Sequence, residues 1–317
     1  MLSAGMTPSS PRRLLWISLS VLLLAGVVWH EQPREPEWEG QPLNHWLAML
    51  AVPWDDLYGE PTKPGESAAY RAFRGTGTNA LPSLLRRLSH PTPAPWEAQV
   101  MRVEEFLDER RIRYPWRRVN EYTFLKEAAL LRAFFALGTA ADPAVPELSR
   151  RLNSTNLTET LRAAHVLARI GSHGVATLFP ASTNAAVEAR AAAVFGLSLA
   201  VTNRSEGFSV IMELRRDVAP RVRASVAQSL QRFDDRPVEV VSALVELMAD
   251  KDVLVRRLAV QSLGSFAKTD LSAAVPVLTK LKADPDAFTS KGASDLLDTI
   301  DALTKAASSS PRAVPIR

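Results

Sequence analysis

The chain has 317 residues, no cysteine and a formal net charge of +4. The lack of cysteine excludes disulfides, thiolate nucleophiles and thiolate metal sites. A net charge this small does not establish nucleic-acid binding, and a hydrophobic fraction of 46% is ordinary for a globular protein with one apolar segment.

Two consecutive arginines precede a run without charges that extends from Leu14 to Trp29. At about 1.5 Å per helical residue this run reaches about 24 Å, a little short of the usual span of a bilayer. Tryptophans near both ends suit membrane interfaces, and the arginines favour a cytoplasmic N-terminus at residues 1–13. We expect a transmembrane or signal-anchor helix at residues 14–29 in the inner membrane, with the remainder exported to the periplasm. A cleaved signal peptide, which would release a secreted soluble form, is the alternative.

Residues 30–42 are polar and rich in proline, which predicts a tether rather than a packed element. An amphipathic helix is predicted next, because apolar residues follow at helical spacing at Leu43, Trp46, Leu47 and Leu50. We expect this helix to cap the apolar end of a domain at residues 43–303. Docking to a membrane partner is the alternative role.

The segment "RVRASVAQSLQRF" at residues 221–233 returns as "LVRRLAVQSLGSF" at residues 254–266, an offset of 33 residues. A fixed period of this length indicates a repeat architecture. In each unit a small or apolar residue stands four positions before a large anchor, which makes one face of a helix. The anchors are Phe73, Phe134, Leu167, Leu197, Leu230, Leu263 and Leu296.

A short break and a second apolar stretch follow most anchor helices, for example "NALPSLLRRL" from Asn79 and "AAVPVLTKLK" from Ala273. Prolines lie near the start of several of these stretches, where a missing backbone N–H costs least. Each unit is therefore predicted to be a helical hairpin. One hairpin cannot bury both of its faces, so stacked neighbours should share a continuous core.

These units resemble HEAT repeats, including the HEAT-like type of phycobilisome-lyase-related proteins. The best matches are "PRVRASVAQSLQRF" and "VLVRRLAVQSLGSF", and the register extends over residues 66–303. The resemblance implies an all-α fold, an α-solenoid of stacked helical hairpins that serves as a binding scaffold. It also implies that the second helices line the concave side, and it carries over no catalytic residue.

The regular period is interrupted by an insertion at residues 89–121. Insertions in repeat proteins map to loops on one face, which is often the binding face. Arginine forks can engage carboxylates or phosphates, and aromatic rings can stack on a sugar or a guanidinium group. The alternative is that the rings pack onto the first hairpins while the arginines are solvated. The candidate partner-binding residues are Arg110, Arg111, Arg113, Tyr114, Trp116, Arg117 and Arg118.

Three arginine pairs fall near the ends of predicted second helices. If these helices line the concave side, the pairs contribute to a basic strip there. The alternative is structural, because cations near a helix C-terminus stabilise its exposed carbonyl groups by about 0.3 to 1 kcal/mol each. The pairs are Arg86 with Arg87, Arg150 with Arg151, and Arg215 with Arg216.

No catalytic or metal-binding pattern stands out, and we expect neither enzymatic activity nor a cofactor or metal. The five histidines are scattered, without a zinc pair or a triad. Recurrent aspartates at the repeat junctions are interpreted as helix caps and turn residues rather than calcium ligands. These are Asp217, Asp250, Asp252, Asp284 and Asp286.

The sequence thus predicts a membrane-tethered, exported scaffold that binds another macromolecule, expected to be a protein, through its concave face or its basic insertion. Nucleic acid and small-molecule substrates are not expected. The alternatives are an enzyme of the chromophore lyase or DNA glycosylase type, in which HEAT-like repeats also occur, and a purely structural envelope protein. Residues 304–317 are predicted to be a disordered tail.

Overall fold

The computed structural model describes residues 36–51, 64–89, 102, 119–200, 202–267 and 269–309. The predicted cytoplasmic segment and anchor at residues 1–29 lie outside these ranges. Among the described residues, Leu125–Leu152 is long and apolar enough to cross a membrane, and 61% of its apolar window is buried inside the structure. Such burial is also typical of a core helix of a soluble protein.

The described chain begins with a small hairpin and a short helix. Strands β1 (Glu37–Trp38) and β2 (Gln41–Pro42) pair antiparallel around a turn in which Glu39 and Gly40 both have positive φ. This geometry suits a two-residue hairpin, so residues 37–42 are not the unstructured tether that their composition predicts. Helix α2 (Leu43–Met49) follows and packs against the first two helical hairpins.

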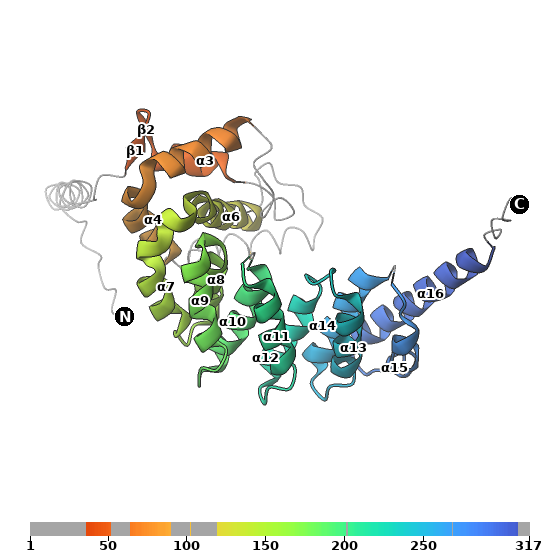
Figure 1. The fold of residues 1–317 in the computed structure, drawn as a ribbon. Helices are drawn as coiled ribbons and strands as arrows, with labels where there is room; N and C mark the ends of the chain where they lie inside the picture. Colours follow the sequence, from red (N-terminus) through yellow and green to blue (C-terminus); the bar gives the residue numbers. More distant parts are fainter. Residues whose placement is uncertain are drawn as a thin grey trace, which may run out of the picture.

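The remaining elements alternate between two rows of helices, here called first and second helices (Figure 1). The first helices are α3 (Pro64–Thr76), α6 (Val119–Leu137), α8 (Leu157–Ile170), α10 (Val187–Leu199), α12 (Pro220–Leu230), α14 (Val253–Leu263) and α16 (Ala287–Ser309). The second helices are α4 (Leu81–Leu88), α7 (Val145–Leu152), α9 (Ser172–Ala181), α11 (Arg204–Leu214), α13 (Pro237–Met248) and α15 (Val275–Leu281).

Short 3₁₀ turns lead into or out of several helices. They are η2 (Gly77–Ala80), η3 (Gly138–Ala144), η4 (Gly264–Phe266) and η5 (Ser272–Ala274). Proline stands in the first turn of α4, α7, α13 and α15, where its missing N–H leaves no helical hydrogen bond unmade. The predicted helical hairpins are confirmed.

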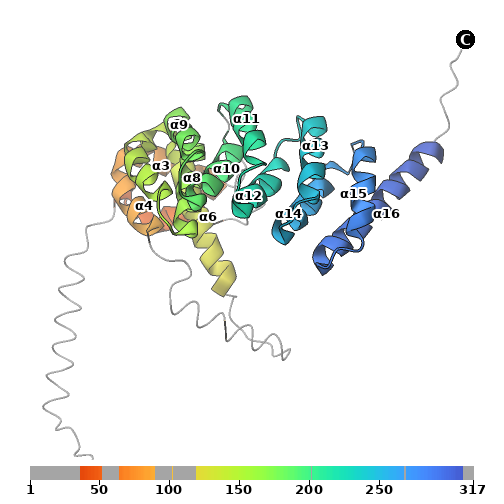
Figure 2. The same cartoon turned by 90° about the horizontal axis from the view of Figure 1, so that it is seen from below.

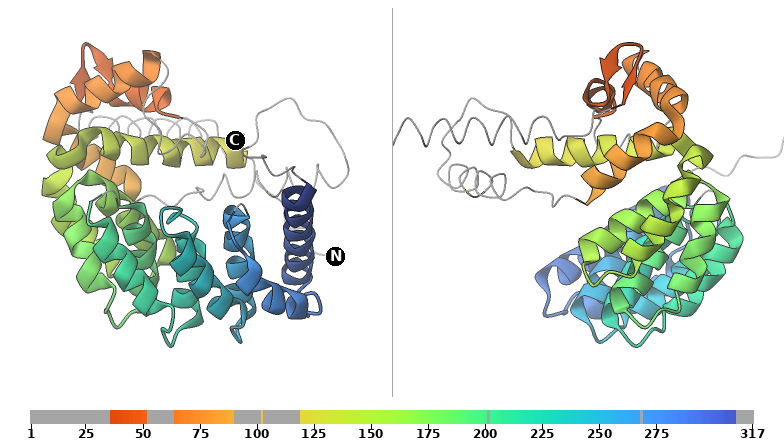
Figure 3. Two further views of the ribbon diagram at one scale, coloured as in Figure 1. Left: turned by 45° about the vertical axis from the view of Figure 1, so that its right-hand side comes forward. Right: turned by 90° about the vertical axis from the view of Figure 1, so that its left-hand side faces the viewer.

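The hairpins stack side by side into a curved array from α3 to α16 (Figures 2 and 3). Each first helix from α8 to α14 packs closely against the first helix on either side, whereas second helices contact one another much less. In a curved stack the inner row is the more tightly packed one. The first helices therefore form the inner row, and the expectation that second helices line the concave side is wrong for this chain.

The repeat register explains this close packing. The anchors from Phe73 to Leu263 are all buried, and the small residues that precede them, such as Ala163, Ala193 and Ala259, have no exposed surface. Small side chains allow the axes of neighbouring helices to approach. In α16 the register moves by one residue, because Ala293 rather than Gly292 is the fully buried small residue.

Candidate binding surface

Most of the basic insertion lies outside the described residues. Its seven candidate residues, Arg110, Arg111, Arg113, Tyr114, Trp116, Arg117 and Arg118, lie outside the described residues. Within the insertion at residues 89–121 the structure describes only Ser89, Arg102 and the first backbone turn of α6. A binding role for this segment therefore stays a prediction.

The three arginine pairs lie at the ends of second helices, as predicted. Arg86 and Arg87 occupy the last turn of α4, and Arg86 Nη2 donates to Ser83 Oγ at 3.3 Å. Because the second helices form the outer row, these pairs do not line the inner face.

Two of the pairs each share one carboxylate. Arg150 Nη2 and Arg151 Nε both lie 2.8 Å from Glu147 Oε1, and Arg151 is almost fully buried. The hydrogen bonds from Arg150 and Arg151 lower the pKa of Glu147 from 4.5 to about 2. In the same way Glu246 of α13 accepts from Arg215 at 2.9 Å and from Arg216 at 3.0 Å. The Glu147 contacts lie within α7, those of Glu246 join the end of α11 to α13, and both neutralise part of the charge of the predicted basic strip.

A more regular set of ion pairs joins successive first helices to the loops that follow. Arg190, Arg223 and Arg256 each stand at the fourth position of their helix and each form a bidentate pair with an aspartate of the next repeat junction. The closest N–O distances are 2.8 Å for Arg190–Asp217, 2.6 Å for Arg223–Asp250 and 2.7 Å for Arg256–Asp284. We call this set the arginine–aspartate ladder.

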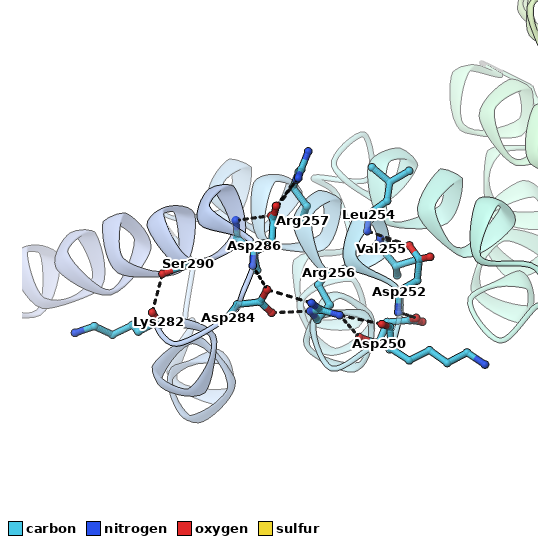
Figure 4. Close-up of polar contacts among 12 residues, drawn as sticks. Asp250, Asp252, Leu254, Val255, Arg256, Arg257, Lys282, Asp284, Asp286 and Ser290 are labelled. Carbon is cyan, nitrogen blue, oxygen red and sulfur yellow. Dashed lines mark hydrogen bonds and ion pairs between the residues drawn. The ribbon is translucent and has the colours of Figure 1, made fainter.

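Each arginine of the ladder also closes the loop before its own helix. Arg256 Nη1 donates to the carbonyl oxygens of Asp250 and Lys251 at 3.0 and 3.1 Å, so its guanidinium group lies between Asp250 and Asp284 (Figure 4). Arg223 makes the equivalent contacts to Asp217 and Val218. The ladder thus fixes the spacing and orientation of one repeat relative to the next.

The aspartates of the ladder are turn residues, as predicted. Asp217, Asp250 and Asp284 each accept a hydrogen bond from the backbone N–H two residues later. Burial by itself would raise the pKa of Asp217 and Asp250, but hydrogen bonds from their arginines and from the backbone hold it below the ordinary value.

Asp252 is the N-cap of α14, where Oδ1 accepts from the N–H groups of Leu254 and Val255. The ion pairs of the ladder were missed by sequence reasoning. The signal was present, because Arg190, Arg223 and Arg256 precede acceptor aspartates by 27, 27 and 28 residues.

The ladder stops at α8, where Thr160 occupies the fourth position. A different pair takes over there, since Arg162 Nε of α8 lies 2.8 Å from Glu127 Oε1 of α6. Both side chains are partly or largely buried. The array therefore has charged cross-links from α6 to α16, interrupted between α8 and α10.

A cluster of rings and guanidinium groups runs along the inner row. Within it, His165 of α8 lies between Phe135 of α6 and Phe195 of α10, with ring centroids 5.7 and 5.4 Å apart. Arg169 lies over the ring of Phe135 at 5.2 Å, and Arg232 lies over that of Phe195 at 5.6 Å. We call these five residues the inner-face cluster.

A separate group lies nearer the N-terminus, where the ring of Tyr70 contacts Arg74 at 5.9 Å and the buried Arg132 at 5.4 Å. Burial, followed by the positive charges of Arg169 and Arg232, lowers the pKa of His165 from 6.5 to about 3. The histidine is thus neutral at physiological pH, and the charge of the cluster comes from its arginines. The five histidines are scattered in the sequence, and sequence reasoning did not connect His165 to its aromatic neighbours.

Comparison with known proteins agrees with this architecture. A family model of HEAT repeats matches residues 208–298. Residues 208–298 are thus similar to HEAT repeats. The matched repeats extend from α11 into α16 and include two of the three ion pairs of the ladder. None of the curated proteins matches the sequence significantly.

The solved structures to which this chain is similar include three with TM-scores below 0.5. An engineered protein shares 19% identity, with 81% of this chain and 96% of that chain covered and a TM-score of 0.42. A designed armadillo repeat protein in complex with the peptide (KR)4 shares 17% identity, with 80% and 99% covered and a TM-score of 0.33. The complex of CpcE and CpcF of phycocyanin lyase from Nostoc sp. PCC7120 shares 18% identity, with 86% and 98% covered and a TM-score of 0.33.

Proposed function

We propose that this protein is a membrane-tethered, exported HEAT-repeat scaffold without enzymatic activity, which binds another protein through the inner face of its helical array. The inner-face cluster is the observation that carries this proposal. Arginine and aromatic side chains are the residue types most enriched at the energetic centres of protein interfaces. Here they come from four consecutive repeats and lie on one continuous row.

The ladder supports the same function. A surface held by buried ion pairs loses little conformational entropy when a partner binds, so more of the contact energy appears as affinity. The proposal of a membrane tether is supported by the sequence alone. Residues 14–29 carry no charge and follow two arginines.

Site-specific photo-crosslinking tests the proposed face. A photoreactive amino acid replaces Gln228, which is exposed on α12, or Val238, which is 79% exposed on the second helix α13. In intact cells the inner position should give a discrete protein adduct and the outer position should not. Replacing Arg169 and Arg232 together by glutamine should abolish the adduct. Equal adducts from both positions, or a nucleic-acid adduct, would contradict the proposal.

The tether needs its own test. Reporter enzymes active only in the periplasm or only in the cytoplasm are fused after Arg317, and membrane fractions are probed for the full-length chain. Activity of the exported reporter alone, with the chain retained in the membrane, is the expected result. Activity of the cytoplasmic reporter alone would contradict export.

A further inference from the structure

Exposed apolar side chains gather where two neighbouring first helices begin. Leu254 and Phe288 are each the second residue of their helices, α14 and α16, and they are 46% and 72% exposed. Val253, at the start of α14, is 43% exposed. Among the described residues these make up half of the large apolar side chains that are exposed. We call Val253, Leu254 and Phe288 the apolar rim.

The ring of Phe288 is held in place although it is exposed. The guanidinium group of Arg257 lies over it, 4.8 Å from the ring centroid. Arg257 is itself fixed by Asp286, with Nε and Oδ2 3.0 Å apart, and Asp286 accepts from the backbone and hydroxyl of Thr289. An aromatic side chain that is ordered before binding loses little entropy when a partner covers it.

The carboxylates near the rim are engaged in the structure. Asp250 and Asp284 belong to the ladder, Asp286 pairs with Arg257, and Asp252 caps α14 (Figure 4). Leu254 and Arg257 point the same way in that view.

Two exposed cations border the rim. Of the four arginines in α12 and α14, three pair with the carboxylates named above: Arg223 with Asp250, Arg256 with Asp284 and Arg257 with Asp286. Arg221, the second residue of α12, and Lys291 of α16 are exposed. The rim is therefore apolar at its centre and positive at its borders.

We propose that the apolar rim binds an acidic segment of the partner protein that carries an apolar side chain. This inference rests on the proposed scaffold function and adds the chemistry of the segment. Neighbouring helix axes lie about 8–10 Å apart, and alternate residues of an extended chain, whose side chains point to the same face, lie about 7 Å apart. Two apolar side chains of one extended segment can thus reach Leu254 and Phe288, while its carboxylates meet Arg221 and Lys291.

Labelled peptides test this chemistry on the full-length protein by fluorescence polarisation. One short peptide has a Leu-Gly-Phe core between aspartates, a second has the same core between lysines, and a third has Ser-Gly-Ser between aspartates. Only the first should bind. Phe288→Ala should weaken its binding by about tenfold or more, whereas Val238→Ala, at a comparably exposed valine on α13, should leave it unchanged. Arg221→Gln should reduce the salt dependence of binding.

The inference is wrong if the aspartate-flanked peptide fails to bind or binds no better than the lysine-flanked one. It is also wrong if the full-length protein binds phosphatidylglycerol vesicles or single-stranded DNA and Phe288→Ala abolishes that binding rather than peptide binding. Crosslinking from Gln228 separates this inference from the proposed function. An adduct from Gln228 without peptide binding would contradict only the proposed peptide site at the apolar rim. Peptide binding without any adduct would support the rim and contradict protein binding at the inner face.

Discussion

Replacing Arg223 by alanine is expected to destabilise the array locally by about 3 kcal/mol, the range for removing one partner of a buried ion pair. Its side chain is 9% exposed and that of Asp250 is 11% exposed, with N–O distances of 2.6 and 2.8 Å. Nη1 also donates to the carbonyl oxygens of Asp217 and Val218 at 2.8 and 3.2 Å. The substitution leaves a partly buried carboxylate and two carbonyl groups without this donor.

Hydrogen exchange measured by mass spectrometry on the full-length chain checks this magnitude. In a repeat protein each unit contacts only its neighbours, so the effect should remain local. Amides of α12, α13 and α14 should exchange about 100-fold faster, which corresponds to about 3 kcal/mol, while those of α8 should not change. The matched control is Arg216→Ala, because Arg216 is 70% exposed and its partner Glu246 is 43% exposed. An exposed pair of this kind contributes at most about 1 kcal/mol.

An equal effect of both substitutions would refute the reasoning, because it would mean that burial does not set the strength of these pairs. So would a uniform acceleration of exchange from α3 to α16. Arg223→Lys gives a further check, since an ammonium group cannot make the bidentate contact and should recover only part of the loss.

Two further predictions follow from burial and close packing. Folding lowers the pKa of His165 from 6.5 to about 3. Between these pH values the imidazole takes up a proton in the unfolded chain but not in the folded one. Stability that is present above pH 6.5 is therefore lost as the pH falls toward 3. Urea denaturation should therefore give a free energy of unfolding about 2 kcal/mol lower at pH 5 than at pH 6.5. His165→Leu should remove this loss. An equal loss of stability in that variant would contradict the role of His165. Gly174→Ala should lower stability by about 1–3 kcal/mol, because the added Cβ would lie 2.3 Å from the carbonyl oxygen of Leu167. Gly264→Ala, whose Cβ meets nothing closer than 3.9 Å, should leave the thermal midpoint unchanged or raise it, and equal losses in both variants would contradict the packing argument.

Much of the fold could be predicted from the sequence because the same pattern of residues occurs in several repeats. The buried anchors, the hairpins and the role of the junction aspartates followed from a period of 33 residues and from ordinary helix and turn chemistry. The small hairpin at residues 37–42 was missed because its composition, rich in proline and acid, is typical of a tether. Its turn depends on a positive φ at Glu39, and glutamate is a residue type that rarely adopts this conformation.

The candidate surface was less predictable. The arginine pairs were correctly located on second helices, but their position relative to the curvature depends on which row packs more tightly. The aromatic and arginine side chains of the inner-face cluster come from positions about one repeat apart, so no local motif joins them. They become neighbours only because adjacent first helices lie side by side.

The sequence by itself determined that this chain forms stacked helical hairpins, because helical periodicity and a period of mostly 33 residues are local properties of the chain. It also determined where aspartates end one unit and begin the next. Only the tertiary structure decided which row of helices faces inward, which arginines are bound by carboxylates, and which rings remain exposed. Those outcomes depend on the rotation and spacing of each repeat against its neighbour, and many side-chain contacts between units set them together.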